Sequence, residues 1–159
     1  MIRCAAETDR LDIGRIYCRA WQAAYRGLVS DEFLDSLTDE GCAPPPGRIA
    51  DGNCLVFEKE GAAVGLVNFG PGRDGDEMAE IRSIYVLPGC WRGGIGAELL
   101  KSAMVELKSR GYRRVFLWTV EGNARARSFY EKQGMQHTGF RDIEIAGRAL
   151  KECRYEMEI

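Results

Sequence analysis

The segment VLPGCWRGGIGAELL, residues 86–100, places four glycines within eight residues, directly before a stretch with apolar residues at helical spacing. Glycine loses more conformational freedom on folding than any other residue, so this density indicates a backbone that approaches another group closely or adopts unusual dihedral angles. The apolar spacing predicts a helix from about Ile95 that ends at Gly111. Main-chain N–H groups at a helix start lack internal partners. We therefore expect this loop to bind a phosphate or pyrophosphate, with a simple packing turn as the alternative.

Two strands flank this loop and its helix. Residues 80–86, EIRSIYV, alternate in the manner of a strand. The expected faces are Ile81, Ser83 and Tyr85 on one side and Arg82, Ile84 and Val86 on the other. Residues 114–120, RVFLWTV, are apolar on both faces, which is typical of a central strand covered by helices. A further helix follows, capped by Asn123 and ended by Gly134.

The rest of the chain supplies further strands and helices without an internal repeat. The remaining expected elements are a strand at 2–5, a helix from 8 or 9 to about 22, a short helix from 30–32, a proline-rich surface loop at 41–48, strands at 55–58 and 63–69, a loop at 70–75 and a final hairpin around 146–148. This order predicts an α/β protein with a mixed sheet in one domain, residues 1–159.

Composition excludes several classes of function. The chain has 159 residues and a net charge of -2, so no basic field indicates nucleic acid or an anionic membrane as partner. No apolar run approaches the ~20 residues of a membrane span. The first ten residues, MIRCAAETDR, lack the apolar centre of a secretory signal. We expect a soluble, cytoplasmic protein.

The six cysteines show no metal-binding spacing. They lie at positions 4, 18, 42, 54, 90 and 153, without a CxxC pair, and His137 is the one histidine. We therefore expect reduced thiols and no metal. A nucleophilic pair of Cys90 and His137 is an alternative that nothing in the sequence brings together.

Known phosphate-binding loops of other types fit poorly. A P-loop needs a Gly-Lys-Ser/Thr ending, which is absent here. A dinucleotide fingerprint needs a third glycine where Leu99 stands, and it begins at the strand end, whereas residues 87–92 intervene here. Glu121 could imitate the ribose-binding acid of that fingerprint, but two of its three elements fail.

Two motifs in order carry a resemblance to a known family. The first is Val-x-Pro-x-x-[Gln/Arg]-x-x-Gly-x-Gly/Ala, with Trp91 in place of Gln or Arg; it stands here as Val86, Pro88, Gly94 and Gly96. The second is Asn-x-x-Ala-x-x-x-Tyr-x-x-x-Gly-Phe, with Met135 in place of Phe; it stands here as Asn123, Ala126, Tyr130 and Gly134. The chain thus resembles the GNAT superfamily of acetyl-CoA-dependent N-acetyltransferases. The resemblance implies a GNAT-like fold, a mixed sheet flanked by about four helices, with acetyl-CoA as co-substrate.

The resemblance also implies roles for single residues. The coenzyme contacts it implies are Ile84, Tyr85, Val86, Trp91, Arg92, Gly93, Gly94, Ile95, Gly96, Asn123, Ala126 and Tyr130. Tyr130 is the expected general acid for the leaving thiolate, because a phenol and a thiol have similar pKa values. Glu80 is the expected general base or ligand of the substrate ammonium. A related branch that acetylates ribosomal protein N-termini has its glutamate where Trp118 stands, so that mechanism is not expected here.

On the acceptor side, the first two helices wall the pocket in the resembling family. Trp21, Tyr25, Arg26 and Phe33 are therefore the expected substrate contacts, with burial in the core as the alternative for the three aromatic residues. Aromatic rings could surround an amine, and Arg26 could bind a carboxylate or phosphate. The loop at residues 44–46 could border this pocket.

The resemblance thus implies acetyl transfer from acetyl-CoA to a primary amine of a small molecule or peptide. We expect the amine to attack directly, without a covalent acyl-enzyme. The alternative is a catalytically weak acyl-CoA-binding sensor. Homodimers through the C-terminal strands are common in the resembling family, so a homodimer is an expected assembly.

Overall fold

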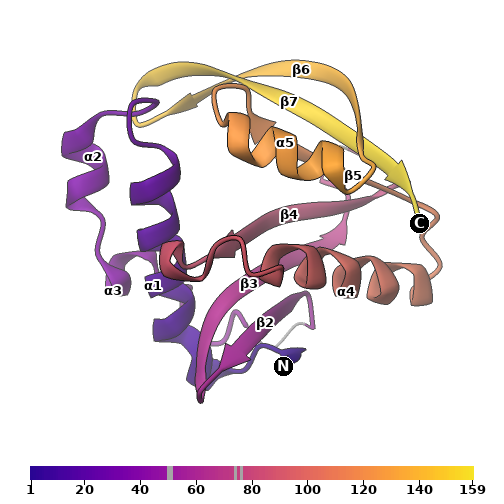
Figure 1. Ribbon diagram of the computed structural model, residues 1–159, viewed down its shortest axis with the longest axis horizontal. Helices are drawn as coiled ribbons and strands as arrows, with labels where there is room; N and C mark the ends of the chain where they lie inside the picture. Colours follow the sequence, from indigo (N-terminus) through magenta and orange to yellow (C-terminus); the bar gives the residue numbers. More distant parts are fainter. Residues whose placement is uncertain (50–51, 74, 76) are drawn as a thin grey trace.

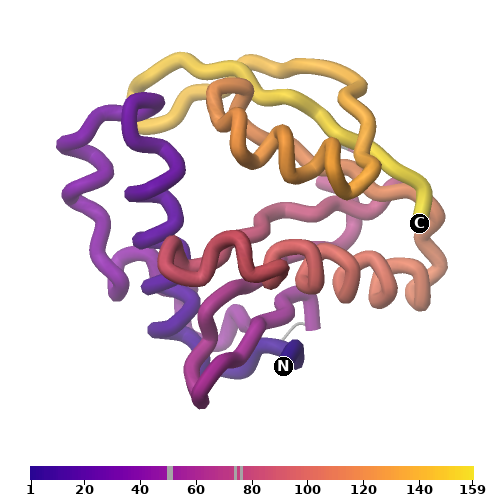
Figure 2. The backbone as a smooth tube through the Cα atoms, viewed as in Figure 1, coloured from indigo at the N-terminus to yellow at the C-terminus, as the bar shows by residue number. Residues whose placement is uncertain are grey.

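A computed structural model describes residues 1–49, 52–73, 75 and 77–159. Figures 1 and 2 show a twisted sheet with helices on both faces. The strands are β1 (Ile2–Cys4), β2 (Cys54–Lys59), β3 (Ala62–Pro71), β4 (Ala79–Val86), β5 (Arg114–Val120), β6 (Gln136–Ile145) and β7 (Arg148–Glu158). The helices are α1 (Arg10–Ala24), α2 (Asp31–Ser36), α3 (Asp39–Cys42), α4 (Ile95–Ser109) and α5 (Ala124–Lys132), with 3₁₀ turns η1 (Glu7–Asp9) and η2 (Pro88–Cys90).

The seven strands form one sheet in the order β1-β2-β3-β4-β5-β7-β6. Every neighbouring pair is antiparallel except β4 and β5, which are parallel. The expected α/β class with a mixed sheet is confirmed. The helix α3 was not expected. Its single turn ends at Cys42, just before the prolines that preclude a helix, so residues 41–42 of the predicted loop are helical. The strand β3 also extends further than expected, to Pro71.

The two parallel strands pair only at one end. Their register contains Ala79 opposite Val115 and Glu80 opposite Phe116, and no further pair. Beyond Glu80 the strands diverge, as Figure 1 shows between β4 and β5. The second half of β4 therefore pairs with β3 on one side, and on the other side no strand of the described residues pairs with it.

A bulge in β4 overturns the expected alternation of its side chains. The register with β3 places Asn68 opposite Ser83 but Phe69 opposite Ile81, so Arg82 is an extra residue. Ile81 consequently packs in the same core cluster as Ile84 and Val86, not on the face of Ser83 and Tyr85. The prediction that Ile81, Ser83 and Tyr85 share a face was wrong because a bulge shifts the two-residue period by one.

Helices cover the two faces of the sheet differently. The helix α1 packs with Leu66 and Val56 in one core cluster. On the opposite face, α4 and α5 share the largest cluster, which includes Leu99, Tyr130 and Phe69. The end of α1 and the helix α2 also pack on β5 and the final hairpin through residues such as Leu34 and Val120. Among the described helices, none has the length and apolar character needed to cross a membrane.

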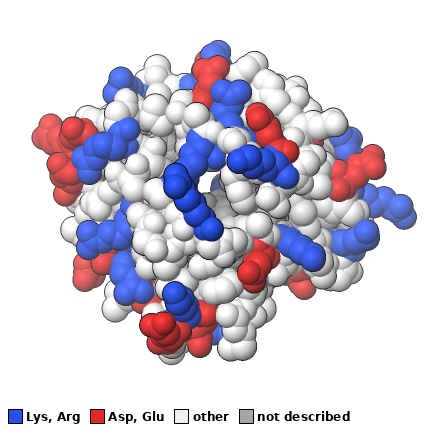
Figure 3. All heavy atoms as spheres, viewed as in Figure 1, with Lys and Arg blue, Asp and Glu red and all other residues white. Residues whose placement is uncertain are grey.

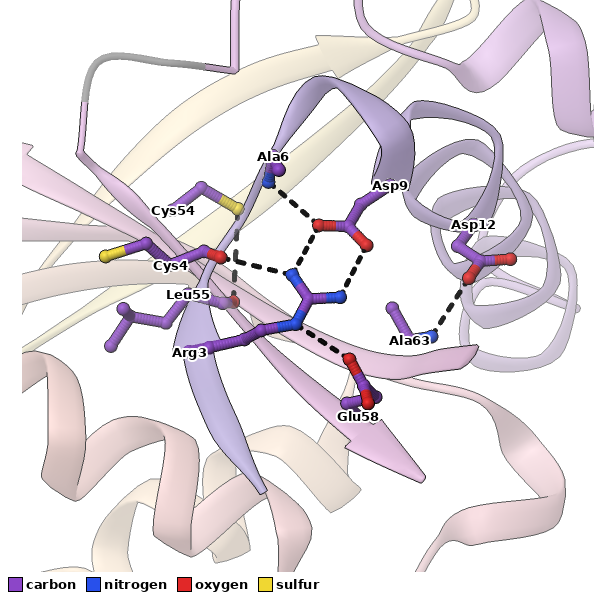
Figure 4. Close-up of polar contacts among 9 residues, drawn as sticks. All are labelled: Arg3, Cys4, Ala6, Asp9, Asp12, Cys54, Leu55, Glu58 and Ala63. Carbon is purple, nitrogen blue, oxygen red and sulfur yellow. Dashed lines mark hydrogen bonds and ion pairs between the residues drawn. The ribbon is translucent and has the colours of Figure 1, made fainter. Parts of the chain in front are cut away.

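A partly buried ion pair fixes the start of α1 against the sheet edge. Figure 4 shows the Arg3 guanidinium of β1 donating to both carboxylate oxygens of Asp9, at 2.7 and 2.8 Å, and to Glu58 of β2 at 2.7 Å. The Asp9 carboxylate also accepts the Ala6 N–H at 2.8 Å. Hydrogen bonds from Arg3 hold the pKa of the Asp9 carboxyl below its ordinary value. This arrangement orients α1, which supplies one wall of a cavity on its face of the sheet.

Asp9→Asn should destabilise the protein by about 2 kcal/mol at pH 7, because it leaves a partly buried guanidinium with a weaker acceptor. A carboxyl with a depressed folded-state pKa stabilises the protein above its unfolded pKa, about 4, and loses that contribution as pH falls through the folded value. The difference from wild type should therefore shrink below about pH 4. Urea unfolding at pH 7 and pH 3 measures it. Asp142→Asn, at a carboxylate 89% exposed, is the control and should change stability little. A difference that persists at pH 3 would contradict the assignment.

Candidate functional site

The glycine loop between β4 and α4 presents unpaired main-chain donors. Gly94 precedes the first residue of α4 with a φ of 83°, and Arg92 has a φ of 65°. Among the described residues, the N–H groups of Gly93, Gly94 and Gly96 have no hydrogen-bond partner. Consecutive free N–H groups at a helix start form a site suited to an anion such as a pyrophosphate.

Trp91 fixes this loop to the end of β4. Its indole Nε1–H donates to the Val86 carbonyl oxygen at 2.7 Å. The Arg125 guanidinium, at the start of α5, lies 3.1 Å from the centre of the Trp91 ring. Burial and the nearby positive charge of Arg92 both lower the pKa of Arg125. The Val86 carbonyl oxygen already accepts a hydrogen bond from Trp91. Of the backbone groups of Val86 that were expected to contact coenzyme, the N–H is therefore the one left available.

The face with α4 and α5 is hollowed at its centre. In Figure 3, blue basic side chains gather around this hollow. Arg92 and Arg125 are close enough for the charge of one to depress the pKa of the other. Two like charges held beside unpaired N–H groups attract an anionic ligand to this face.

The second motif positions a buried phenol. The Asn123 side chain accepts the Ala126 N–H at 3.1 Å and so caps α5. One turn later Tyr130 is 8% exposed and packs against Phe129 and Tyr155, with ring centres 5.2 and 6.1 Å away. Burial raises the pKa of Tyr130 well above its ordinary value, with a smaller contribution from Tyr25. The hydroxyl therefore stays protonated at every physiological pH.

Glu80 lies buried where β4 still pairs with β5. Its side chain is 4% exposed, and both of its carboxylate oxygens accept hydrogen bonds from Arg73, at 2.7 Å from Nη2 and 2.9 Å from Nε. The Arg73 N–H also reaches this carboxylate, at 3.2 Å. Before Glu80 could accept a proton from a substrate, Arg73 would have to release at least one of these oxygens.

A cavity of about 650 Å³ opens on the α1 face of the sheet. Its lining comes from helices α1, α2 and α3, from strands β2, β3 and β4, and from the segments that follow α2, α3 and β3. The residues are Ile13, Tyr17, Trp21, Phe33, Leu37, Cys42, Pro44, Arg48, Ile49, Asn53, Cys54, Asn68, Arg73, Arg82, Ser83 and Tyr85. The volume suits a small molecule. The cavity and the glycine loop thus lie on opposite faces, and both adjoin the open part of β4.

The expected acceptor residues divide between the cavity and its surroundings. Trp21 and Phe33 line the cavity, as does Pro44 of the proline-rich loop. Tyr25 is buried and stacks on Trp21, with ring centres 4.4 Å apart. Arg26 is not among the lining residues, and its guanidinium pairs with Asp31 and Asp35 of α2 at 3.2 and 3.0 Å. The structure therefore does not bring Arg26 to the pocket.

Several lining residues were not found from the sequence. The Tyr17 hydroxyl lies 2.9 Å from the Ser83 hydroxyl, and the Asn68 amide donates to both, at 2.6 and 3.0 Å. The Trp21 Nε1–H donates to the Tyr85 hydroxyl at 3.0 Å. These residues are 15 to 66 positions apart in the chain, so no local spacing could have grouped them.

The described contacts bring together neither the Cys90–His137 pair nor a set of metal-ligating side chains. In the part of the chain that the structure describes, no hydrogen bond or ring contact joins Cys90 to His137, and His137 packs against Phe140 and Tyr155. Within the same residues, no group of three His, Cys, Asp or Glu side chains is arranged to hold a metal.

Gly94→Ala and Gly96→Ala should have opposite outcomes. Gly94 has open space around a new Cβ but a left-handed φ, so alanine there should cost about 1 kcal/mol of unfolding free energy. A Cβ at Gly96 would lie 3.5 Å from the Phe129 ring, an ordinary contact inside a helix, so alanine should be neutral or stabilising by up to about 1 kcal/mol. Denaturant unfolding of both variants measures this. Equal destabilisation would contradict the described loop conformation.

Comparison with known proteins relates this chain to N-acetyltransferases. The sequence is 34% identical to an uncharacterized N-acetyltransferase of Archaeoglobus fulgidus over 140 residues, 85% of this chain and 92% of that protein. It is 27% identical to a protein of Mycobacterium tuberculosis named as a probable N-acetyltransferase, over 94% of this chain and 82% of that one.

The fold is also that of a solved coenzyme complex. The PaiA N-acetyltransferase from Thermoplasma acidophilum, in complex with coenzyme A, matches with a TM-score of 0.75 and 20% identity over 100% of this chain and 98% of that one. The model of the acetyltransferase (GNAT) family matches residues 12–135, which include the glycine loop, Tyr130 and Glu80. This chain belongs to the GNAT acetyltransferase family.

Proposed function

We propose that this protein transfers the acetyl group of acetyl-CoA to a primary amine of a small molecule or peptide held in the cavity on the α1 face. The single observation that carries the proposal is the open edge of β4. It lies between the free N–H groups of the glycine loop on one face and the cavity on the other. A coenzyme bound through its pyrophosphate at the loop would run its arm along this edge and present the thioester to the amine.

In the proposed reaction the neutral amine attacks the thioester carbonyl carbon. A new C–N bond forms, the C–S bond breaks, the nitrogen loses a proton, and the sulfur of coenzyme A gains one. In the second half of β4, backbone groups alternate between the β3 side and the open edge, and the Leu87 N–H bonds to β3. The N–H groups of Ile84 and Val86, which point away from β3, would stabilise the oxyanion of the tetrahedral intermediate. The remaining coenzyme contacts would come from Arg92, Gly93, Gly94, Ile95 and Gly96 of the loop and from Asn123 and Ala126 of α5.

Tyr130 is the proposed proton donor to the leaving thiolate. Its burial and its protonated state at all working pH values favour donation over acceptance. The same burial makes the phenol a weaker acid than an exposed tyrosine. The transfer to sulfur is therefore less evenly balanced than the ordinary pKa predicts. The hydroxyl would first donate a hydrogen bond to the developing thiolate and then transfer its proton as the C–S bond breaks.

The experiment that tests the function is a calorimetric titration with acetyl-CoA, coenzyme A and NADH, followed by a thiol-release assay with pooled amines. Binding of acetyl-CoA but not of NADH, together with thiol release, would support the enzyme. Initial rates should follow a sequential pattern, and a ping-pong pattern would refute direct attack. Binding of acetyl-CoA without release for any amine would favour the alternative, an acyl-CoA-binding sensor.

Tyr130→Phe should lower kcat by about 100-fold, the typical contribution of a general acid. The affinity for acetyl-CoA should stay within about twofold, because the ring that packs in the core remains. Since the pKa of Tyr130 is raised, wild-type activity should show no loss from its ionisation below about pH 10. Steady-state rates across pH and a calorimetric Kd measure these effects. An unchanged kcat would refute the role.

Glu80→Gln and Arg73→Gln separate two roles for the buried ion pair. If Glu80 accepts the amine proton, Glu80→Gln should lower kcat about 100-fold. Arg73→Gln should then cost less than about tenfold, because it frees the base. Equal losses in both variants would instead mean that Glu80 only positions Arg73. Both kcat and KM over pH 6–9 provide the readout.

A further inference from the structure

The charged side chains that line the cavity are all positive among the residues the structure describes. They are Arg48, Arg73 and Arg82, and no aspartate or glutamate accompanies them in the lining. The positive charge of Arg73 is balanced by the buried Glu80 carboxylate, with which it forms an ion pair. Neither Arg48 nor Arg82 forms an ion pair with any of the described residues. The cavity therefore holds two cations without a protein counter-charge in the described part of the chain.

The position of Arg82 is built into the sheet. It is the bulged residue of β4, and its guanidinium lies against the backbone of β3 at Gly70. A Cβ at Gly70 would come within 2.9 Å of the Arg82 Nη2, so a larger residue there would displace the guanidinium. Nη2 donates to the Pro71 carbonyl at 3.2 Å, which fixes the orientation of the fork.

The guanidinium of Arg82 is not saturated by these contacts. Its Nε is shielded from solvent and has no hydrogen-bond partner in the described structure. A shielded N–H of a charged group without an acceptor is costly. The described residues contain one other such guanidinium N–H, the Arg15 Nε, which does not line the cavity. Since one terminal nitrogen is held by Pro71, the fork still has donors for a planar or tetrahedral anion in the cavity.

Four other polar side chains of the cavity form hydrogen bonds within the protein. Tyr17, Ser83 and Asn68 satisfy one another, and the Tyr85 hydroxyl accepts from Trp21. The rings of Tyr17, Trp21 and Tyr85 offer apolar surface to the body of a ligand. A polycationic acceptor would be repelled by Arg48 and Arg82, because no lining carboxylate in the described residues offsets them.

We propose that the acceptor is an amine that also carries an anionic group, a carboxylate or a phosphate, and that Arg82 and Arg48 bind that group. This inference rests on the proposed acetyl transfer and names the substrate class of the same site. Arg82 is the principal ligand, since its fork is fixed by the bulge, by Gly70 and by Pro71. Arg48, an exposed residue of the loop after α3, adds a second cation to the anion site.

Matched amines that differ only in the anionic group test the proposal. The pairs are L-phenylalanine with phenethylamine, L-leucine with 3-methylbutylamine, and O-phosphoethanolamine with ethanolamine; spermidine represents the polycations. At least one anionic member should show a kcat/KM about tenfold or more above its partner, mainly through KM, as expected for a charge-assisted hydrogen-bonded pair. The pair with the larger ratio distinguishes carboxylate from phosphate.

Variants assign the preference to the two arginines. Arg82→Gln should reduce the ratio within the favoured pair to about one by raising KM of the anionic member, and Arg82→Lys should retain part of it. Arg48→Gln should reduce the ratio by a smaller factor. Arg113→Gln, at an exposed position outside the cavity lining, is the matched control and should leave the ratio unchanged. Acetyl-CoA affinity, measured for each variant, checks that the fold is intact.

Failure of this inference is distinguishable from failure of the proposed function. Ratios near one in every pair, or a preference for spermidine, would overturn the anion site while acetyl transfer stands. If acetyl-CoA binds and no amine is acetylated, the proposed function falls. Calorimetric titration with N-acetyl-L-phenylalanine and N-(2-phenylethyl)acetamide then tests the site without turnover. Tighter binding of the carboxylate that is lost in Arg82→Gln would support the anion site, and equal affinities would overturn it.

Discussion

The parting of β4 from β5 is the constraint on which the rest of the site depends. A parallel pair with only two register pairs leaves most of one strand edge in the middle of the sheet without a partner strand in the part of the chain that the structure describes. Unpaired backbone groups in a protein interior are costly unless something completes their hydrogen bonds. The bulge at Arg82 lies just past the last of these pairs, where it bends β4 and increases its twist. The glycine loop follows at the end of the same strand, so the open edge and the anion-binding N–H groups have a common origin.

Local patterns in the sequence predicted the elements but not the change of face within β4. Glycine density predicted the loop, Asn123 and Gly134 bounded α5, and the doubly apolar run at 114–120 identified the central strand. These signals act over a few residues. The bulge has no such signal, because one added residue in a strand is set by pairing with β3 and not by the composition of β4. The alternation predicted for Ile81 failed for that reason.

The two halves of the candidate site differ in how far the sequence predicted their residues. The coenzyme side comes from two continuous segments, so its residues could be listed from motifs. The acceptor side is assembled from separate helices, loops and strands, and only Trp21, Phe33 and the proline-rich loop were foreseen. Arg26 was expected to contact the substrate, with binding of an anion as one option, but its guanidinium pairs with Asp31 and Asp35. The arginines that do line the cavity come from two loops and a strand. Only the three-dimensional arrangement of those segments brings them together.

The packing of Arg125 on Trp91 has a consequence for how this loop can vary among related sequences. The indole uses its N–H on Val86 and its face on Arg125, so both residues depend on the aromatic ring. An arginine at position 91, which the family pattern allows, would place a third guanidinium beside Arg92 and Arg125. Residues 91 and 125 are therefore expected to covary: a tryptophan accompanies a cation at the start of α5, and a basic residue at 91 accompanies a neutral one. A substitution at residue 91 or 125 alone would remove the contact between the indole ring and the guanidinium. The two residues are therefore expected to change together, and the pair would distinguish a subgroup of sequences.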